Sequence, residues 1–168
     1  MNNPTNNTSP QYMTVGKKFC FGGGLCVDHN GPVIASRECL FLVVAHTAGG
    51  TLGVGVAMAA GGLIGAVIGA VILGTVTGLT EAQKKTPTLI ETDLSLLPIK
   101  VTQHQDWPIK KINKCRMVVV PRDAVTEIRR SMTGNLILET TSKRVRIYLD
   151  LFGRKEKLSF LTAVGWTS

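Results

Sequence analysis

Charge is absent from one long stretch of this 168-residue sequence. No Asp, Glu, Lys or Arg occurs between Glu38 and Glu81, a run of 42 residues that holds 10 of the 18 glycines. Because charged residues make up 18% of the chain, a gap this long is not a fluctuation of an ordinary soluble composition. The gap argues against one water-soluble domain that includes the whole chain.

Cysteines are also few, and their spacing is uninformative. The four cysteines, Cys20, Cys26, Cys39 and Cys115, impose no disulfide framework on a chain of this length. Cys20, Cys26, His29 and Cys39 are a candidate zinc set, but their C-x5-C-x2-H-x9-C spacing matches no compact zinc-binding pattern. We therefore expect ordinary core cysteines, with no metal and no cofactor.

Patterns typical of catalysis are missing as well. His46 and His104 have no acidic or nucleophilic neighbour in the sequence, so a catalytic triad is unsupported. The glycine-rich turn at 46–50 fails the dinucleotide fingerprint, because Met58 stands at the third glycine position and no acidic residue follows before Glu81. We predict that the protein is not an enzyme; a metal enzyme built on the first three cysteines is kept only as a distant third class.

The uncharged segment 46–79 is long enough to cross a membrane. As a helix, its 34 residues would extend roughly 50 Å, against about 30 Å for the hydrocarbon core of a bilayer. A helix that is apolar on every side has no face for water, and a chain of this length has no core large enough to hold it. The segment is predicted to be a transmembrane helix or a helical hairpin.

Small residues recur at every fourth position of this segment. Such a stripe is a glycine zipper, in which two helix backbones approach closely and gain packing that lipid tails do not provide. We expect it to mediate helix packing and a homo-oligomer. The stripe consists of Gly49, Gly53, Ala57, Gly61, Gly65 and Gly69.

Five regions are expected along the chain, and outside the membrane segment the patterns are those of a β-rich domain. Asn30 and Gly31 tolerate positive φ and predict a hairpin turn between two strands. Strand 145–149 alternates apolar and polar residues, and helix 154–166 has one apolar face that would cap a sheet. The regions are a disordered tail (1–13), N-terminal β-strands (14–45), the membrane segment (46–79), a linker with a short strand at Leu97–Thr102 (80–114), and a β-meander with a C-terminal helix (115–168).

Two stretches resemble GRAM and bacterial pleckstrin-homology-like domains. The first, GGLCVDHNGPVIASRECLFLVV, is similar to their opening strands. In the second, VVVPRDAVTEIRRSMTGNLILETTSKRVRIYLDLF is similar to the later strands and RKEKLSFLTAVGW to the closing helix. The resemblance covers roughly half of the chain and rests on pattern. It implies an α+β fold, with a pleckstrin-homology-like sheet or partial barrel and a C-terminal helix.

The two similar stretches are separated, unlike those of the family, by about 70 residues between Val44 and Arg116. If they pair, both ends of the membrane segment lie on one side, and the segment is a hairpin that turns near 61–62. If they do not, one span leaves 14–44 on the far side. In either topology the C-terminal part is expected to be cytoplasmic, because 16 of the 19 Lys and Arg follow Leu79.

A group of cations on the predicted sheet and helix suggests a surface for anionic lipid headgroups. An ordinary solvated face is the alternative. Nucleic acid is not expected as a partner, because only Tyr148 offers a stacking surface among these cations. The residues are Arg129, Arg130, Lys143, Arg144, Arg146, Arg154, Lys155 and Lys157.

The sequence therefore predicts a non-enzymatic integral membrane protein. Its glycine zipper would anchor a basic pleckstrin-homology-like domain at the cytoplasmic surface, where it acts in membrane association or in binding lipid or protein. An oligomeric pore or channel is the alternative, although the segment between Thr51 and Thr75 carries no polar lining.

Overall fold

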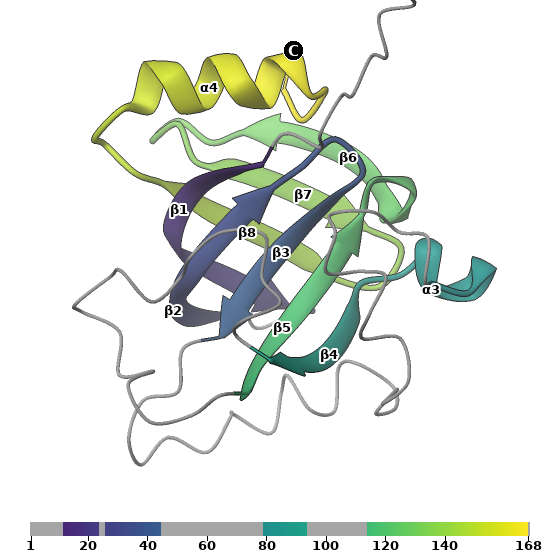
Figure 1. The fold of residues 1–168 in the computed structure, drawn as a ribbon. Coiled ribbons are helices and arrows are strands. Elements are labelled where there is room, and N and C mark those ends of the chain that lie inside the picture. The colour runs from purple at the N-terminus through teal and green to yellow at the C-terminus, as the bar shows by residue number, and fades with distance from the viewer. Residues whose placement is uncertain (1–11, 24–25, 45–78, 94–113, 168) are drawn as a thin grey trace, which may run out of the picture.

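The computed structural model describes residues 12–23, 26–44, 79–93 and 114–167. Within these residues, one antiparallel sheet has eight strands in the order β4-β5-β3-β2-β1-β8-β7-β6. Figure 1 shows that the sheet curls into a half-barrel and that helix α4 lies across one end of it. The strands are β1 (Met13–Gly22), β2 (Cys26–Ala35), β3 (Cys39–Val44), β4 (Thr88–Asp93), β5 (Lys114–Pro121), β6 (Val125–Arg130), β7 (Leu136–Thr140) and β8 (Arg144–Leu149); the helices are α3 (Glu81–Lys84), the 3-10 turn η3 (Arg122–Ala124) and α4 (Arg154–Ala163).

This architecture confirms the predicted β-rich fold with a C-terminal helix, and it is compatible with a pleckstrin-homology-like fold. The C-terminal elements match their predicted positions closely. On β8, Val145, Ile147 and Leu149 are buried, as their alternation with polar residues predicts. From α4, Leu161 enters the core that the curled sheet encloses, and Leu158 packs against it.

The strands that precede residues 45–78 pair directly with strands that follow them. β3 pairs with β5, with Leu40 opposite Val120, and β1 pairs with β8, with Phe19 opposite Ile147. The two similar stretches of the sequence therefore form one sheet.

The predicted hairpin turn at Asn30 and Gly31 is wrong, because both residues lie inside β2. The chain turns instead between β1 and β2, after Gly22, where glycines also provide turn chemistry. The register between β1 and β2 shifts beside Gly31, whose φ of 152° is one that other residues rarely adopt. Asn-Gly thus marks an irregularity in the strand and not its end.

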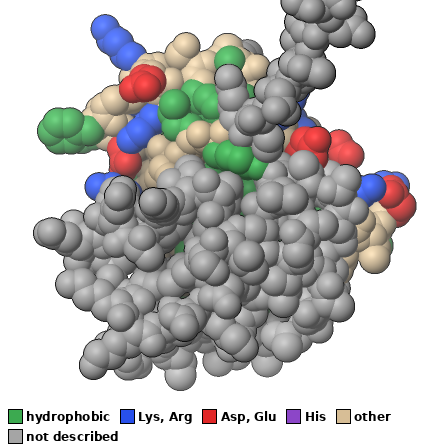
Figure 2. Space-filling model, in the orientation of Figure 1, with side chains coloured by type: hydrophobic (Ala, Val, Ile, Leu, Met, Phe, Trp, Pro, Cys, Tyr) green, Lys and Arg blue, Asp and Glu red, His purple; other side chains and the backbone are tan. Residues whose placement is uncertain are grey.

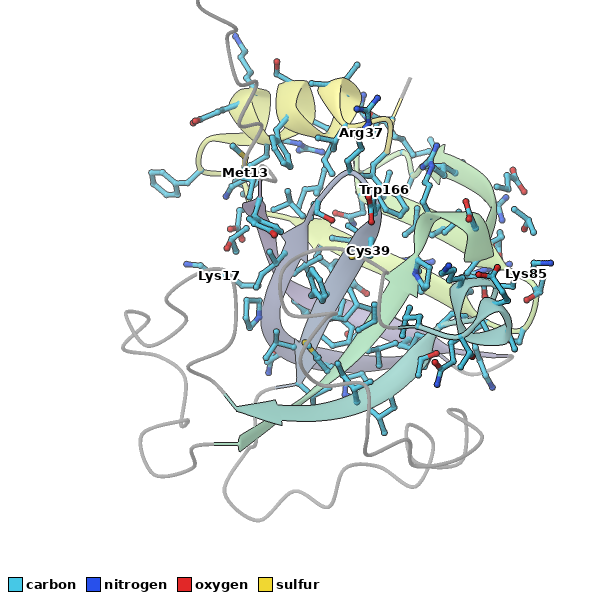
Figure 3. All side chains as sticks on the ribbon, turned by 45° about the vertical axis from the view of Figure 1, so that its right-hand side comes forward. Met13, Lys17, Arg37, Cys39, Lys85 and Trp166 are labelled. Carbon is cyan, nitrogen blue, oxygen red and sulfur yellow. The ribbon has the colours of Figure 1, made fainter. Side chains whose placement is uncertain are left out.

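A second turn, at 36–38, separates β2 from β3. The Ser36 hydroxyl donates to the Cys39 carbonyl at 3.0 Å and accepts from the Cys39 amide at 3.2 Å. The indole Nε1 of Trp166, just beyond α4, donates to the Ser36 carbonyl at 2.6 Å. Figure 3 shows Trp166 beside this turn, above Cys39.

The range predicted as a linker, 80–114, contains two ordered elements. Helix α3 begins with a capping box, in which Thr80 and Gln83 each accept a hydrogen bond from the other's backbone amide. Strand β4 pairs with β5, with Thr88 opposite Val119. The predicted strand at Leu97–Thr102 lies outside the described residues, as do residues 1–11 of the predicted disordered tail.

Strands β3 and β5 are buried on both faces. Leu42 and Val118 belong to the core, whereas Val43 and Met117, which alternate with them and so point to the other face, are also 0% exposed. The continuous apolar runs of these strands, CLFLVV and MVVV, are typical of strands without a wet face.

Candidate functional site

The eight cations predicted as a lipid surface are distributed over two strands, a turn and a helix. β6 carries Arg129 and Arg130, β8 carries Arg144 and Arg146, and Lys143 immediately precedes β8. The other three, Arg154, Lys155 and Lys157, lie on α4. On the face drawn in Figure 2, Lys/Arg and Asp/Glu side chains are interspersed among the described residues.

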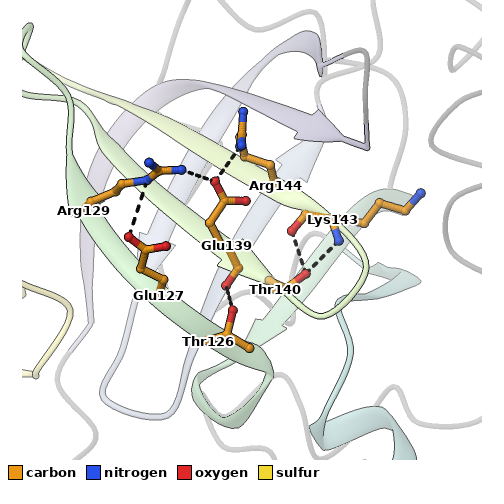
Figure 4. Close-up of polar contacts among 7 residues, drawn as sticks. All are labelled: Thr126, Glu127, Arg129, Glu139, Thr140, Lys143 and Arg144. Carbon is orange, nitrogen blue, oxygen red and sulfur yellow. Dashed lines mark hydrogen bonds and ion pairs between the residues drawn. The ribbon is translucent and has the colours of Figure 1, made fainter.

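Two of these arginines share one carboxylate on the outer face of the sheet (Figure 4). Arg129 Nη2 lies 2.5 Å and Arg144 Nε 2.6 Å from Glu139 Oε1, and Glu127 lies 3.8 Å from Arg129 Nε. Burial alone would raise the pKa of Glu139, but the hydrogen bonds from Arg129 and Arg144 outweigh burial and hold it below its ordinary value. These two arginines are largely satisfied within the fold.

A second ion pair on this face joins β1, β2 and β8. Lys18 Nζ lies 2.6 Å from Asp28 Oδ2, and the Tyr148 hydroxyl donates to Asp28 Oδ1 at 3.0 Å. The hydrogen bond from Lys18 is the main cause that lowers the pKa of Asp28. Sequence reasoning missed this group because the three residues are brought together only by the strand register.

Two cations of α4 fasten loops instead of facing solvent freely. Arg154 Nη2 donates to the Thr133 carbonyl at 3.0 Å, which ties the turn between β6 and β7 to the start of α4. Lys157 Nζ lies 2.9 Å from Asp150 Oδ2 and donates to the Phe152 carbonyl at 3.0 Å. These contacts hold the loop between β8 and α4.

The two loops joined by Arg154 carry large apolar side chains in solvent. Leu151 and Phe152 are 79% and 93% exposed, and Met132 is fully exposed. Arg130 and Lys155 flank them in the chain and, within the described residues, make no ion pair. We call Met132, Leu151 and Phe152 the apolar loops.

A groove of about 590 Å³ runs along β6. Every residue of the strand, Val125–Arg130, lines it, so the groove follows the strand's open edge. Since β6 is last in the sheet, it pairs with β7 alone among the described strands. Gly165 and Thr167 line the groove from beyond α4, and Arg122 lines it from η3.

Arg122, beside this groove, contacts an aromatic ring and has a buried nitrogen without a hydrogen-bond partner. Its guanidinium carbon lies 4.8 Å from the centroid of the Trp166 ring, a cation–π contact. Its Nη1 is buried and has no hydrogen-bond partner. Sequence reasoning did not select Arg122, and no local signal connects it to Trp166.

The cysteine-histidine set does not assemble as a metal site in the described part of the chain. The register places Cys20 opposite Asp28 and Phe19 opposite His29, so Cys20 and His29 lie on opposite faces of the sheet. Cys20 is disulfide-bonded. Burial raises the pKa of the Cys39 thiol to about 12, which disfavours the thiolate that zinc requires. No group of three or more His, Cys, Asp or Glu with metal-binding geometry occurs among the described residues.

Except for Leu79, which is buried in the described structure, the predicted membrane segment 46–79 is outside the described residues. This applies to its six helix-packing positions, Gly49, Gly53, Ala57, Gly61, Gly65 and Gly69, and to His46. Within the described residues, no helix is sufficiently long and apolar to span a bilayer. Comparison of the chain with protein-family models, curated proteins and solved structures finds no match.

Proposed function

We propose that the chain is a non-enzymatic membrane protein in which segment 46–79 enters the bilayer and the half-barrel domain stays at the cytoplasmic surface. The domain, in this proposal a GRAM-like member of the pleckstrin-homology-like fold, binds lipid or protein there. The long uncharged run supports insertion, because its side chains gain free energy on leaving water. The excess of cations after Leu79 supports the cytoplasmic side.

The pairing of β3 with β5 is the observation that carries this proposal. β3 ends at Val44, where the chain leaves the described sheet, and the chain returns at Leu79 before α3 and β4. Since β4 pairs with β5 and β5 with β3, both ends of the segment belong to one folded body. A single span would place β1, β2 and β3 across the bilayer from β5 and β8, so these strands could not pair. The pairing therefore supports a hairpin that enters and leaves the bilayer on the same side.

We further propose that the apolar loops contact the membrane surface. Aromatic and apolar side chains that protrude from a domain are suited to the interface between headgroups and hydrocarbon. Arg130 and Lys155 would add attraction to anionic lipids, about 1 kcal/mol for each cation near the surface. The arginines that pair with Glu139 contribute less, because their charge is already compensated.

The small-residue stripe gives the proposed oligomer its contact. A leucine at Gly65 would separate two closely packed helices. We expect Gly65→Leu to reduce cross-linking between copies in membranes, whereas unchanged cross-linking would remove the zipper from the proposal.

Membrane sidedness tests the central proposal directly. Lys17→Cys on β1 and Thr141→Cys before β8 place thiols at two exposed positions, one before and one after the segment in the sequence. In sealed vesicles, an impermeant maleimide should label both positions or neither, according to vesicle orientation. Detergent-opened vesicles control for reactivity, and the parent chain controls for its native cysteines.

Extraction provides the second measurement. The full chain should stay with membranes in alkaline carbonate, and a variant in which a glycine-serine sequence of equal length replaces residues 45–78 should not. Labelling of the two thiols from opposite sides would disprove the hairpin. A full chain that purifies as a monomer without detergent would disprove membrane insertion altogether.

A further inference from the structure

The groove along β6 has the features of a docking site for an extended polypeptide. We propose that it binds a segment of a partner protein as an added β-strand, with apolar residues in the middle of the segment and carboxylates towards its ends. This site lies at the edge of β6, shares Arg130 with the surface proposed around the apolar loops, and goes beyond the function proposed above.

The open edge of β6 provides the main-chain part of the site. An edge strand presents N–H and C=O groups that no neighbouring strand satisfies, and an incoming strand can pair with them. The six residues of β6 extend about 20 Å at ~3.3 Å per residue. Because all six line the groove, its length fits a peptide segment and exceeds what an inorganic anion would occupy.

Along the groove, the apolar side chains of Val125 and Ile128 lie between the cations Arg122 and Arg130, together with the polar Thr126 and Glu127. Val125 and Ile128 are partly buried and pack against the core, so they offer a hydrophobic surface. Alternation places Arg130, the last residue of the strand, on the same face as Ile128. Arg129 points to the opposite face, where Glu139 compensates its charge.

Arg122 provides the second cation, and its state favours a carboxylate ligand. A buried guanidinium N–H without an acceptor is unfavourable, and Nη1 of Arg122 is such a group. Arg122 lines the groove, so a carboxylate of a bound segment would accept a charge-assisted hydrogen bond from its guanidinium, which Trp166 holds in place. Neither Arg122 nor Arg130 has an acidic partner among the described residues.

Gly165 leaves space on the side of the groove opposite the strand. Its φ of +85° is unfavourable for other residues, and a Cβ at this position would meet no atom within 4 Å. The wall is therefore free of a side chain where the backbone of a bound segment would pass.

A synthetic peptide tests the proposal with the full chain in detergent micelles. The probe is a fluorescein-labelled octapeptide with glutamate at each end of a Val-Thr-Val-Thr-Val-Thr core, and fluorescence anisotropy measures its binding. We expect saturable binding and slower amide hydrogen exchange in Val125–Arg130. The double variant Arg122→Gln with Arg130→Gln should weaken binding by about tenfold or more, the worth of one or two charge-assisted hydrogen bonds.

Matched controls separate strand addition from simple charge attraction. Arg144→Gln removes an arginine that pairs with Glu139 and should leave peptide binding unchanged. The same peptide with alternate amides N-methylated keeps its charge but cannot pair as a strand, and it should bind at least about tenfold more weakly. If Arg122→Gln disturbs the fold, as near-ultraviolet circular dichroism of the tryptophans would reveal, the exposed Arg130→Gln and the methylated peptide still provide the test.

Three results would overturn the proposal. These are the absence of saturable peptide binding, equal binding of the methylated peptide, and displacement of the peptide by inorganic phosphate or by phosphatidylserine added to the micelles. The last result would identify a small-anion or headgroup site. None of them affects the sidedness test of membrane insertion, so the two proposals fail independently.

Discussion

The two halves of the curled sheet are buried in different ways. β3 and β5 have no wet face, since residues on both of their sides are buried, whereas β7 and β8 bury one face and expose the other. On the exposed face, charges are arranged as a paired lattice around Glu139 and Asp28. The comparison teaches that a count of cations does not define a binding surface, because Lys18, Arg129 and Arg144 on the wet half already have carboxylate partners.

The same substitution to aspartate on each half should distinguish the two halves most strongly. Val43→Asp puts a carboxylate at a position of β3 that is 0% exposed, and we expect a loss of about 3 kcal/mol or more in the free energy of unfolding. Ile137→Asp, on the outer and partly exposed face of β7, should cost about 1 kcal/mol. Urea unfolding followed by tryptophan fluorescence measures both, and equal losses would show that the halves do not differ.

Trp166 joins the end of α4 to the turn before β3 and to η3 after β5, so its replacement should have an intermediate effect. Trp166→Phe retains an aromatic ring but removes the hydrogen bond to the Ser36 carbonyl and weakens the contact with Arg122. We expect a loss of about 2 kcal/mol in unfolding free energy. Trp107, the other tryptophan, lies outside the described residues, and Trp107→Phe serves as the spectroscopic control. A change below about 0.5 kcal/mol would contradict the role given to the indole.

The apolar loops provide a functional test, because they should contribute to lipid binding and not to stability. Phe152→Asp changes a side chain that is 93% exposed, so stability should hardly change. Binding to phosphatidylserine vesicles should fall several-fold when this substitution is made in the variant whose residues 45–78 are replaced by the glycine-serine sequence. Thr141→Asp adds the same charge at an exposed turn and is the matched control. An equal loss of binding in both variants would show that the added negative charge, and not the lost phenyl ring, weakens binding.

Removing the Glu139 carboxylate from the ion pairs on the exposed face should have the smallest effect on the free energy of unfolding, and this effect should depend on pH. Since the folded pKa of Glu139 is depressed, its contribution to stability is complete above about pH 4.3, the ordinary glutamate value, and is lost as the pH falls through the folded pKa. Glu139→Gln should cost at most about 1 kcal/mol at neutral pH, because the partners are half-exposed. Chemical unfolding at several pH values should show the two proteins converging below that range, and a constant difference would refute this account.

Elements defined by local chemistry were predictable, and those defined by distant partners were not. The alternation in β8 and the apolar face of α4 depend on neighbouring residues, so their positions follow from the sequence. Asn30 and Gly31 satisfy the needs of a turn and of a strand irregularity equally, and only the pairing of β1 with β2 distinguishes the two. Strand β4 was missed because β5 stabilises it from far along the chain.

The candidate site was predictable to a smaller extent. The sequence identifies the cations of β6, β8 and α4 but not the carboxylates that neutralise some of them, because Glu139 meets Arg129 and Arg144 through the register. Arg122 and Trp166 are distant in sequence and meet only when η3 and the end of α4 converge. The groove at the edge of β6 is therefore a property of the tertiary structure.

The union of β1 with β8 has a consequence for biosynthesis. Phe19 and its partner Ile147 are separated by about 130 residues, which a ribosome translates in on the order of 10 s. During this interval the first three strands leave the exit tunnel, the uncharged run follows, and the half-barrel still lacks its closing strands. Nascent chains therefore expose the unpaired edges of the early strands during this interval, and such edges favour aggregation unless another molecule covers them until translation ends.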